Sequence, residues 1–175
     1  MVNVDPAVIV DAARRILADE LLPTIRAVVA DLGGDGPDTL VHSRPTTAGS
    51  DWPTNTAAAL VHHLCGVLAS WGASCLGGED VDRDRDTEFA FTGPVRPELD
   101  RLGALIARLP GWVAAAVERG ELATPAGTTV DVDAARRAGT FTPEWVVGHI
   151  LHEVAAHTGQ LQVTRDVLLS RGRSR

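Results

Sequence analysis

The sequence predicts an all-α protein, a four-helix bundle, on three observations. Four segments repeat their apolar residues with a helical period, and each is long enough for a bundle. Loops rich in Gly, Pro, Asp and Thr separate the four segments. Nothing in the sequence resembles a strand except a short extended piece predicted over 128–132. We expect one domain, 1–175, because a chain of 175 residues can bury a sufficient core without disulfides.

The first two helices are predicted over about 6–31 and 55–76. Asp5 and Pro6 stand at the N-cap and first helical positions of the first helix. Pro23 should kink this helix, because proline removes an N–H donor and its ring crowds the preceding turn. Two consecutive glycines follow each of the two helices and end it.

The third helix is predicted over about 97–119 and the fourth over about 143–170. Pro110 should break the third helix. Thr142 is placed to cap the fourth, with proline at the first helical position.

Two connections are long for a bundle. Residues 33–54 form a loop of about 20 residues against the usual 2–8, which indicates that this loop covers a site. Residues 121–141 are predicted to form an irregular connection between the last two helices.

The composition excludes several classes of protein. A net charge of −7 argues against a nucleic-acid partner, because binding phosphates requires a basic face. We see no apolar run that approaches the ~18 residues of a spanning helix and no signal peptide, so we expect a cytoplasmic protein that does not enter a membrane. Cys65 and Cys75 lie ten residues apart on one predicted helix, ~15 Å along its axis, and should be reduced core thiols.

Histidines concentrate on the second and fourth predicted helices. On the second, His63 falls within the apolar stripe that contains Leu60, Val67 and Trp71, so it should point into the bundle. His62 is rotated from that stripe by about 100° and should lie on a less buried face.

On the fourth helix, His149, Glu153 and His157 are spaced i, i+4, i+8 and share one face. A buried glutamate is costly unless it is paired, and the chain has no lysine to pair with it. Arginine or histidine could neutralise it in a purely structural network, but a metal ion does so more completely. Because His149 and His157 are ~12 Å apart along the helix, one ion can take either His149/Glu153 or Glu153/His157. With His63 as third ligand, the site keeps an open position, as catalytic metal sites do.

Two other motifs do not support a site. His152, Glu153 and His157 resemble the zincin helix motif but carry one residue too many between Glu and the second His. The alternating acids of 80–86 lack the glycine and the final acid of a calcium loop. With Arg83 and Arg85 these acids are expected to form a self-neutralising surface turn.

Taken together, these residues resemble the DinB/YfiT-like superfamily. Asn55-Thr56, followed after six residues by His63-Leu64, is similar to the pattern that supplies the first metal histidine in that superfamily. Two further segments are similar to the branch that contains mycothiol S-transferases and mycothiol-dependent maleylpyruvate isomerases. These are Arg83-Asp84-Arg85 with Glu88-Phe89, and Trp145, His149, Glu153, His157, Gly159-Gln160 and Arg165-Asp166. The match spans roughly residues 40–170, with Gln160 where the branch more often has histidine.

The resemblance implies an up-down-down-up four-helix bundle, commonly a homodimer, with His63, Glu153 and His157 as metal ligands. It implies zinc, with nickel or iron as alternatives, and mycothiol as a thiol cosubstrate that attacks an electrophile. Mycothiol occurs in certain high-GC bacteria, which agrees with a lysine-free, arginine-rich chain.

Three functions follow from these observations. The first is a metal-dependent thiol S-transferase or isomerase; the second is a hydrolase with metal-bound water; the third is a metal-binding stress-response module without activity. His149 could orient Glu153 or be an ordinary core histidine. We expect Asn55 to cap its helix rather than reach the pocket, and Arg165 to form a salt bridge rather than bind an anionic substrate.

Overall fold

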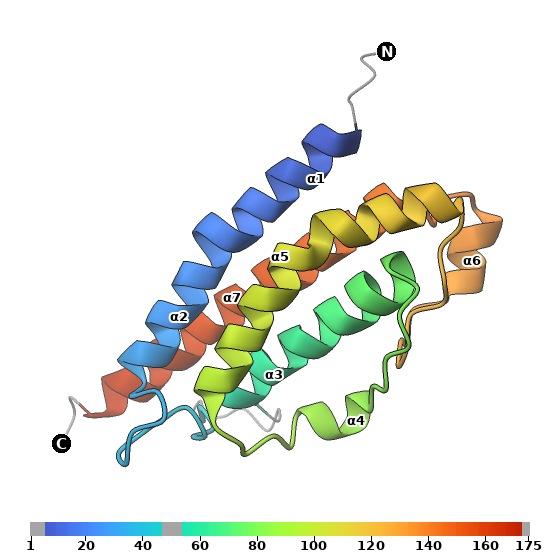
Figure 1. Ribbon diagram of the computed structural model, residues 1–175. Helices are drawn as coiled ribbons and strands as arrows, with labels where there is room; N and C mark the ends of the chain where they lie inside the picture. The colour runs from blue at the N-terminus through green and yellow to red at the C-terminus, as the bar shows by residue number, and fades with distance from the viewer. Residues whose placement is uncertain (1–5, 47–53, 173–175) are drawn as a thin grey trace.

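The computed structural model describes residues 6–46 and 54–172, and all regular structure within them is helical. Four long helical stretches lie side by side, and short helices lie in two of the connections (Figure 1). The long stretches are α1 (Pro6–Arg15), η1 (Ile16–Leu21) and α2 (Leu22–Asp31); α3 (Ala57–Val67) and η2 (Leu68–Leu76); α5 (Val95–Arg119); and α7 (Pro143–Gly172). The short helices are α4 (Arg85–Glu88) and α6 (Val132–Arg137). Asp5, the expected first cap, lies outside the described residues.

The four-helix bundle predicted from the sequence is confirmed, with its up-down-down-up order. In Figure 1, α1 and α7 run in one direction, whereas α3 and α5 run in the other. Both α1 and α3 contact α5 and α7, so α1 and α3 occupy opposite corners of the bundle. This order places α3 against α7, the two helices that carry the candidate ligands.

The disturbance expected at Pro23 takes the form of a π-helical segment, η1, immediately before it. The N–H of Leu22 donates to the carbonyl of Leu17, five residues back, instead of four. The wider turn lets the helix continue past a residue that cannot donate a hydrogen bond and whose ring would crowd a regular turn.

The second stretch is the core helix of the bundle. Thr56 caps it by accepting a hydrogen bond from the N–H of Ala59 at 3.1 Å. The cap is therefore not Asn55, where we expected it, but the residue after it. Every residue of α3 and η2 is buried except His62, which is half-buried. Contrary to the expectation from the sequence, Ala57–Leu76 is long and apolar enough to cross a membrane, but it is 89% buried, as the core helix of a soluble protein is.

The break expected at Pro110 is wrong. α5 is one helix from Val95 to Arg119, and it changes direction along its length (Figure 1). Its apolar face continues on both sides of the proline through the buried Ile106 and Trp112, and burying this face outweighs the one lost backbone hydrogen bond. The cap expected for α7 is confirmed, because Thr142 Oγ1 accepts from the N–H of Trp145 at 3.3 Å.

Both long connections contain features that the sequence did not predict. In the described part of the 33–54 loop, the carboxylate of Asp35 accepts from the N–H groups of Val95 (2.7 Å) and Arg96 (3.1 Å) and so caps α5. Residues 121–141 contain a helix that we did not predict, α6, capped by Asp131, and no strand forms over 128–132. Residues 47–53 lie outside the described part.

Cys65 and Cys75 are free and buried, as predicted. Burial raises the pKa of both thiols, that of Cys75 to about 12, so neither is a thiolate near neutral pH.

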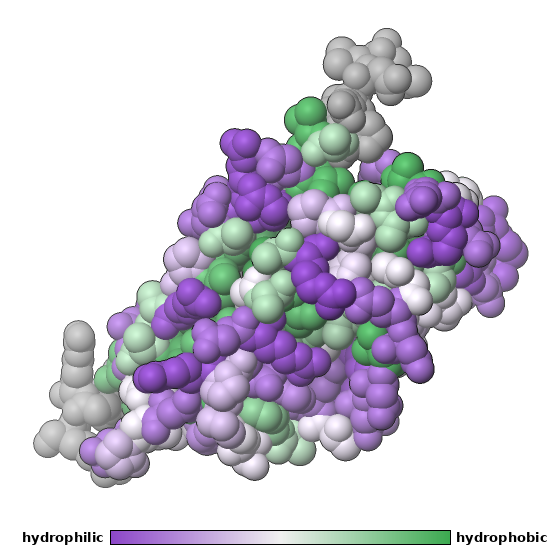
Figure 2. Space-filling view, in the orientation of Figure 1, coloured by the Kyte–Doolittle hydropathy of each residue, from purple (hydrophilic) through white to green (hydrophobic). Residues whose placement is uncertain are grey.

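The outer face of the bundle is mainly polar, as Figure 2 shows for one side. Between α1 and α5 lies an open groove of about 780 Å³, lined by the exposed Val117 and by the buried Val10 and Val113.

Candidate metal centre

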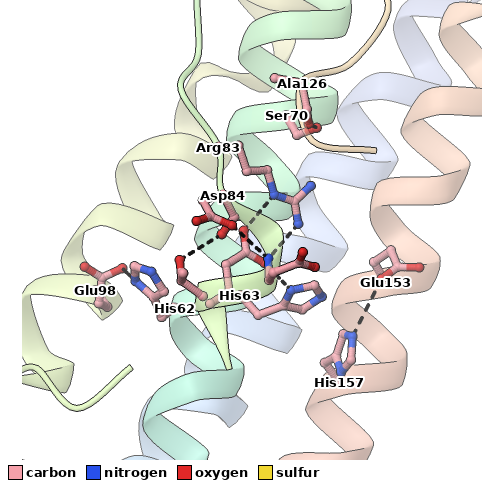
Figure 3. A network of polar contacts seen from close by, with 12 residues as sticks. His62, His63, Ser70, Arg83, Asp84, Glu98, Ala126, Glu153 and His157 are labelled. Carbon is pink, nitrogen blue, oxygen red and sulfur yellow. Dashed lines mark hydrogen bonds and ion pairs between the residues drawn. The ribbon is translucent and has the colours of Figure 1, made fainter. Parts of the chain in front are cut away.

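The structure brings together the three predicted ligands. His63 projects from α3 toward Glu153 and His157 on α7 (Figure 3). One ligand atom of each residue lies within 4.8 Å of the others, a spacing that a single ion can bridge. His157 Nε2 is 3.6 Å from Glu153 Oε2, and the rings of His63 and His157 are 4.8 Å apart. Of the two pairs left open by helix spacing, Glu153/His157 is the one that forms this cluster.

Each histidine of the cluster has its Nδ1 occupied by a side-chain oxygen. His63 Nδ1 lies 2.6 Å from Glu88 Oε2, and because an ionised carboxylate can only accept, Nδ1 carries the proton and donates it. His157 Nδ1 donates in the same way to Gln160 Oε1 at 3.0 Å. Both Nε2 atoms therefore keep a lone pair for a metal, the arrangement in which an outer partner fixes the tautomer and orientation of a ligand.

Sequence reasoning missed Glu88. Its carboxylate also accepts from Arg83, at 2.6 Å from Nε and 3.1 Å from Nη2, and both side chains are only 5% exposed. Burial alone would raise the pKa of Glu88, but the hydrogen bonds from His63 and Arg83, together with the charge of Arg83, outweigh it and lower the pKa to about 2. Glu88 is thus an anion at neutral pH, held between the guanidinium and the imidazole.

The prediction that Arg83 belongs to a self-neutralising surface turn over 80–86 is therefore wrong. Its side chain turns inward to pair with Glu88 instead of neutralising the neighbouring aspartates. The resembling segment contained both residues, five apart, but spacing in an irregular segment does not reveal which side chains meet.

Gly66 makes the approach of Glu88 feasible. A Cβ atom at this position of α3 would lie 2.0 Å from Glu88 Oε1 and 2.8 Å from its Cδ, distances that real side chains do not reach. The carboxylate therefore packs directly on the backbone of α3, one turn after His63.

His62 points away from the cluster, as its helical face predicted. Its Nδ1 is 3.0 Å from Glu98 Oε2 (Figure 3). Its ring stacks on Phe91 with centroids 4.3 Å apart.

His149 lies beside the cluster without joining it. Its Nε2 is 3.9 Å from Glu153 Oε1, beyond hydrogen-bond distance, and its ring stacks on Trp145 and meets the edge of Trp71. Burial lowers the pKa of both His149 and His157, which favours the neutral imidazole that metal coordination requires.

Arg165 lies away from the cluster. It contacts Asp166 at 2.9 Å and Asp31 at 3.4 Å, so it links the ends of α7 and α2 as a salt bridge. Asn55 lines neither the small cavity beside the cluster nor the two open pockets next to it.

A small polar cavity of about 70 Å³ adjoins the cluster. The described part of the 33–54 loop does not line it; the wall opposite the helices comes from residues 128–130 instead. Its lining residues are His63, Val67, Trp71, Arg83, Arg85, Thr128, Thr129, Val130, His149 and Glu153. The wall is tied to η2, because the hydroxyl of Ser70 donates to the carbonyl of Ala126 (Figure 3).

The donor set suits a divalent transition metal. Two imidazole nitrogens and one carboxylate oxygen match the ligands of catalytic zinc, which leave a further position for a bound molecule. His63, Glu153 and His157 would hold such an ion, which would supply a place for one further ligand.

Comparison with known proteins adds one finding. A protein-family model described as mycothiol S-transferase matches residues 22–169, most of the chain and all three candidate ligands. No curated protein and no solved structure matches the chain.

Proposed function

The chain belongs to the mycothiol S-transferase family, and we propose that it joins the sulfur of a thiol, mycothiol, to an electrophilic carbon, with the leaving group and the thiol proton released, at a metal centre formed by His63, Glu153 and His157. A divalent ion bound there, with zinc the best match to the donors, would act as a Lewis acid that lowers the pKa of the thiol. The observation that carries the proposal is the convergence of these three side chains, with both histidines presenting Nε2.

The residues around the cluster support this role. Arg83 and Glu88 hold His63 in one orientation, and Gln160 holds His157. The chain supplies no sulfur nucleophile of its own, because Cys65 and Cys75 are buried and burial raises the pKa of both thiols. The attacking thiol must then come from a small molecule, whose protonation a bound ion would control.

Cobalt substitution tests the proposal. Mycothiol is titrated into the cobalt-loaded protein, with S-methyl mycothiol, which cannot form a thiolate, as the matched control. We expect a sulfur-to-cobalt charge-transfer band with mycothiol alone. If no thiol changes the spectrum of the cobalt-loaded protein, the proposal of thiol transfer is wrong. The remaining hypotheses are then a metal-dependent hydrolase and a metal-binding module without activity.

The single domain, the homodimer and the cytoplasmic location remain predictions. Size-exclusion chromatography with light scattering measures the oligomeric state directly, and a strictly monomeric protein at micromolar concentration would contradict the dimer.

A further inference from the structure

Arg85 is an unpaired cation beside the candidate metal centre. It is the first residue of α4, and it lines the same cavity as His63 and Glu153. Among the described residues its side chain has no ion-pair or hydrogen-bond partner, whereas the neighbouring Arg83 is held by Glu88. Within residues 6–46 and 54–172, the guanidinium of Arg85 is therefore left without a compensating charge at the edge of the site.

The neighbouring acids do not neutralise it. Asp84 Oδ1 accepts from the N–H of Asp86 and caps α4, and both aspartates are exposed. Neither aspartate lines the cavity. Both line the outer groove that shares Arg85, Thr128 and Thr129 with it, and Asp84 also lines a separate pocket beside His62. Glu153 is the carboxylate that lines the cavity together with Arg85; its ionic contacts among the described residues are with His149 and His157, and under the proposed function it is a ligand of the ion. With the ion bound, a partner for Arg85 inside the cavity would then come from a bound molecule.

The opposite wall offers hydroxyl donors. Thr128 and Thr129 line the cavity with Arg85, and Thr128 Oγ1 already accepts from the N–H of Val130 at 3.2 Å. Because a hydroxyl that accepts one hydrogen bond still has its proton to donate, Thr128 can donate to an anion. The space of about 70 Å³ suits a small group such as a carboxylate.

Charge also favours an anion here, on the basis of the proposed function. A divalent ion and Arg85 would bring three positive charges, while Glu153 and a thiolate would bring two negative ones; the Arg83–Glu88 pair cancels. One positive charge would remain in a partly enclosed site, where it attracts a single negative group.

We propose that Arg85, with Thr128 and Thr129, forms a subsite for a carboxylate of the electrophilic substrate. Its guanidinium holds the carboxylate while the reactive carbon of the same molecule faces the thiolate. With iodoacetate as a simple electrophile, the sulfur forms a bond to the methylene carbon, iodide leaves with the bonding electron pair, and the proton of the thiol goes to solvent.

Binding to the zinc-loaded protein without thiol tests the subsite without thiol chemistry, and it keeps the positive charge of the ion that favours an anion here. The indole N–H signal of Trp71, which lines the cavity, is followed by NMR during titration with malonate, or with malonamide as the neutral control. We expect malonate to shift this signal with saturation, and Arg85→Gln to weaken binding about ten- to hundredfold, as expected for a lost charge-assisted hydrogen bond. Arg137→Gln, which removes an exposed arginine that lines no part of the cavity, should bind malonate as the wild type does.

Three results would overturn the subsite: equal binding of malonate and malonamide, unchanged malonate binding by Arg85→Gln, or binding of inorganic phosphate but not malonate. In the loaded enzyme, Arg85→Gln should lower the rate of mycothiol alkylation by iodoacetate relative to neutral iodoacetamide about tenfold or more. If the loaded enzyme alkylates mycothiol with neither reagent, the proposed function fails, while the NMR titration still decides the subsite.

Discussion

Gly66 lies under the carboxylate of Glu88, so Gly66→Ala should disturb the support of His63 without touching the ligand itself. In a helix interior, Gly to Ala normally stabilises by about 0.5–1 kcal/mol. Here the new Cβ would lie 2.0 Å from Glu88 Oε1, so the carboxylate must leave. Breaking a buried ion pair costs about 3–5 kcal/mol, which predicts a net loss of about 2–4 kcal/mol.

The assay is denaturant unfolding of the metal-free protein, with Gly148→Ala as the control. Gly148 is an exposed residue within α7 with no atom near its added Cβ, so this change should stabilise slightly. In a Glu88→Ala background, Gly66→Ala should lose most of its cost, because the clashing group is gone. The reasoning is refuted if Gly66→Ala is as stable as the wild type, or if it costs the same in both backgrounds.

Three further predictions concern the surroundings of the cluster. Glu88→Gln should lower the metal affinity about 10–100-fold, measured by competition with a chelator. Glu98→Gln, which removes the carboxylate beside His62, should leave the metal affinity unchanged. Equal effects of the two changes would contradict the role of Glu88. Folding lowers the pKa of Glu88 from about 4.5 to about 2. The ionised carboxylate therefore contributes about 3 kcal/mol to the free energy of unfolding at pH values above 4.5, and this contribution is lost as the pH falls toward 2. The difference in unfolding free energy between wild type and Glu88→Gln should therefore shrink over that range, and a constant difference would refute the lowered pKa. Gly127→Ala should destabilise the protein by more than the ~1–2 kcal/mol that a left-handed backbone costs a residue with a Cβ, because the new Cβ would lie 2.9 Å from the carbonyl oxygen of Arg83. Gly139→Ala is the control, since Gly139 is also left-handed but has no atom near its added Cβ. Equal losses of stability in the two variants would contradict the contact with Arg83.

Much of the fold followed from local signals. Periodicity and the paired glycines located the four long helices, and the helical faces separated His63 from His62. Helix spacing alone left His149 and His157 as alternatives, because both lie one turn from Glu153. The packing of α3 against α7 brings His157 into the cluster.

The parts that were missed depend on tertiary contacts. Glu88 reaches His63 across 25 residues of sequence, from a four-residue helix with no periodicity to read. The π-helical segments depend on how whole helices pack, which no short motif specifies. Likewise, the cavity wall at 128–130 is positioned by contacts such as Ser70 with Ala126, not by its own propensity.

The metal content of the purified protein shows whether His63 is a ligand of a bound ion. Wild type, His63→Ala and His62→Ala are purified identically, their helicity is compared by circular dichroism, and bound divalent metal is measured by mass spectrometry. We predict about one ion per chain in the wild type and in His62→Ala, and loss of the ion from a folded His63→Ala, because removing one of three protein ligands opens the site. Retention of metal by His63→Ala together with its loss from His62→Ala would contradict the account.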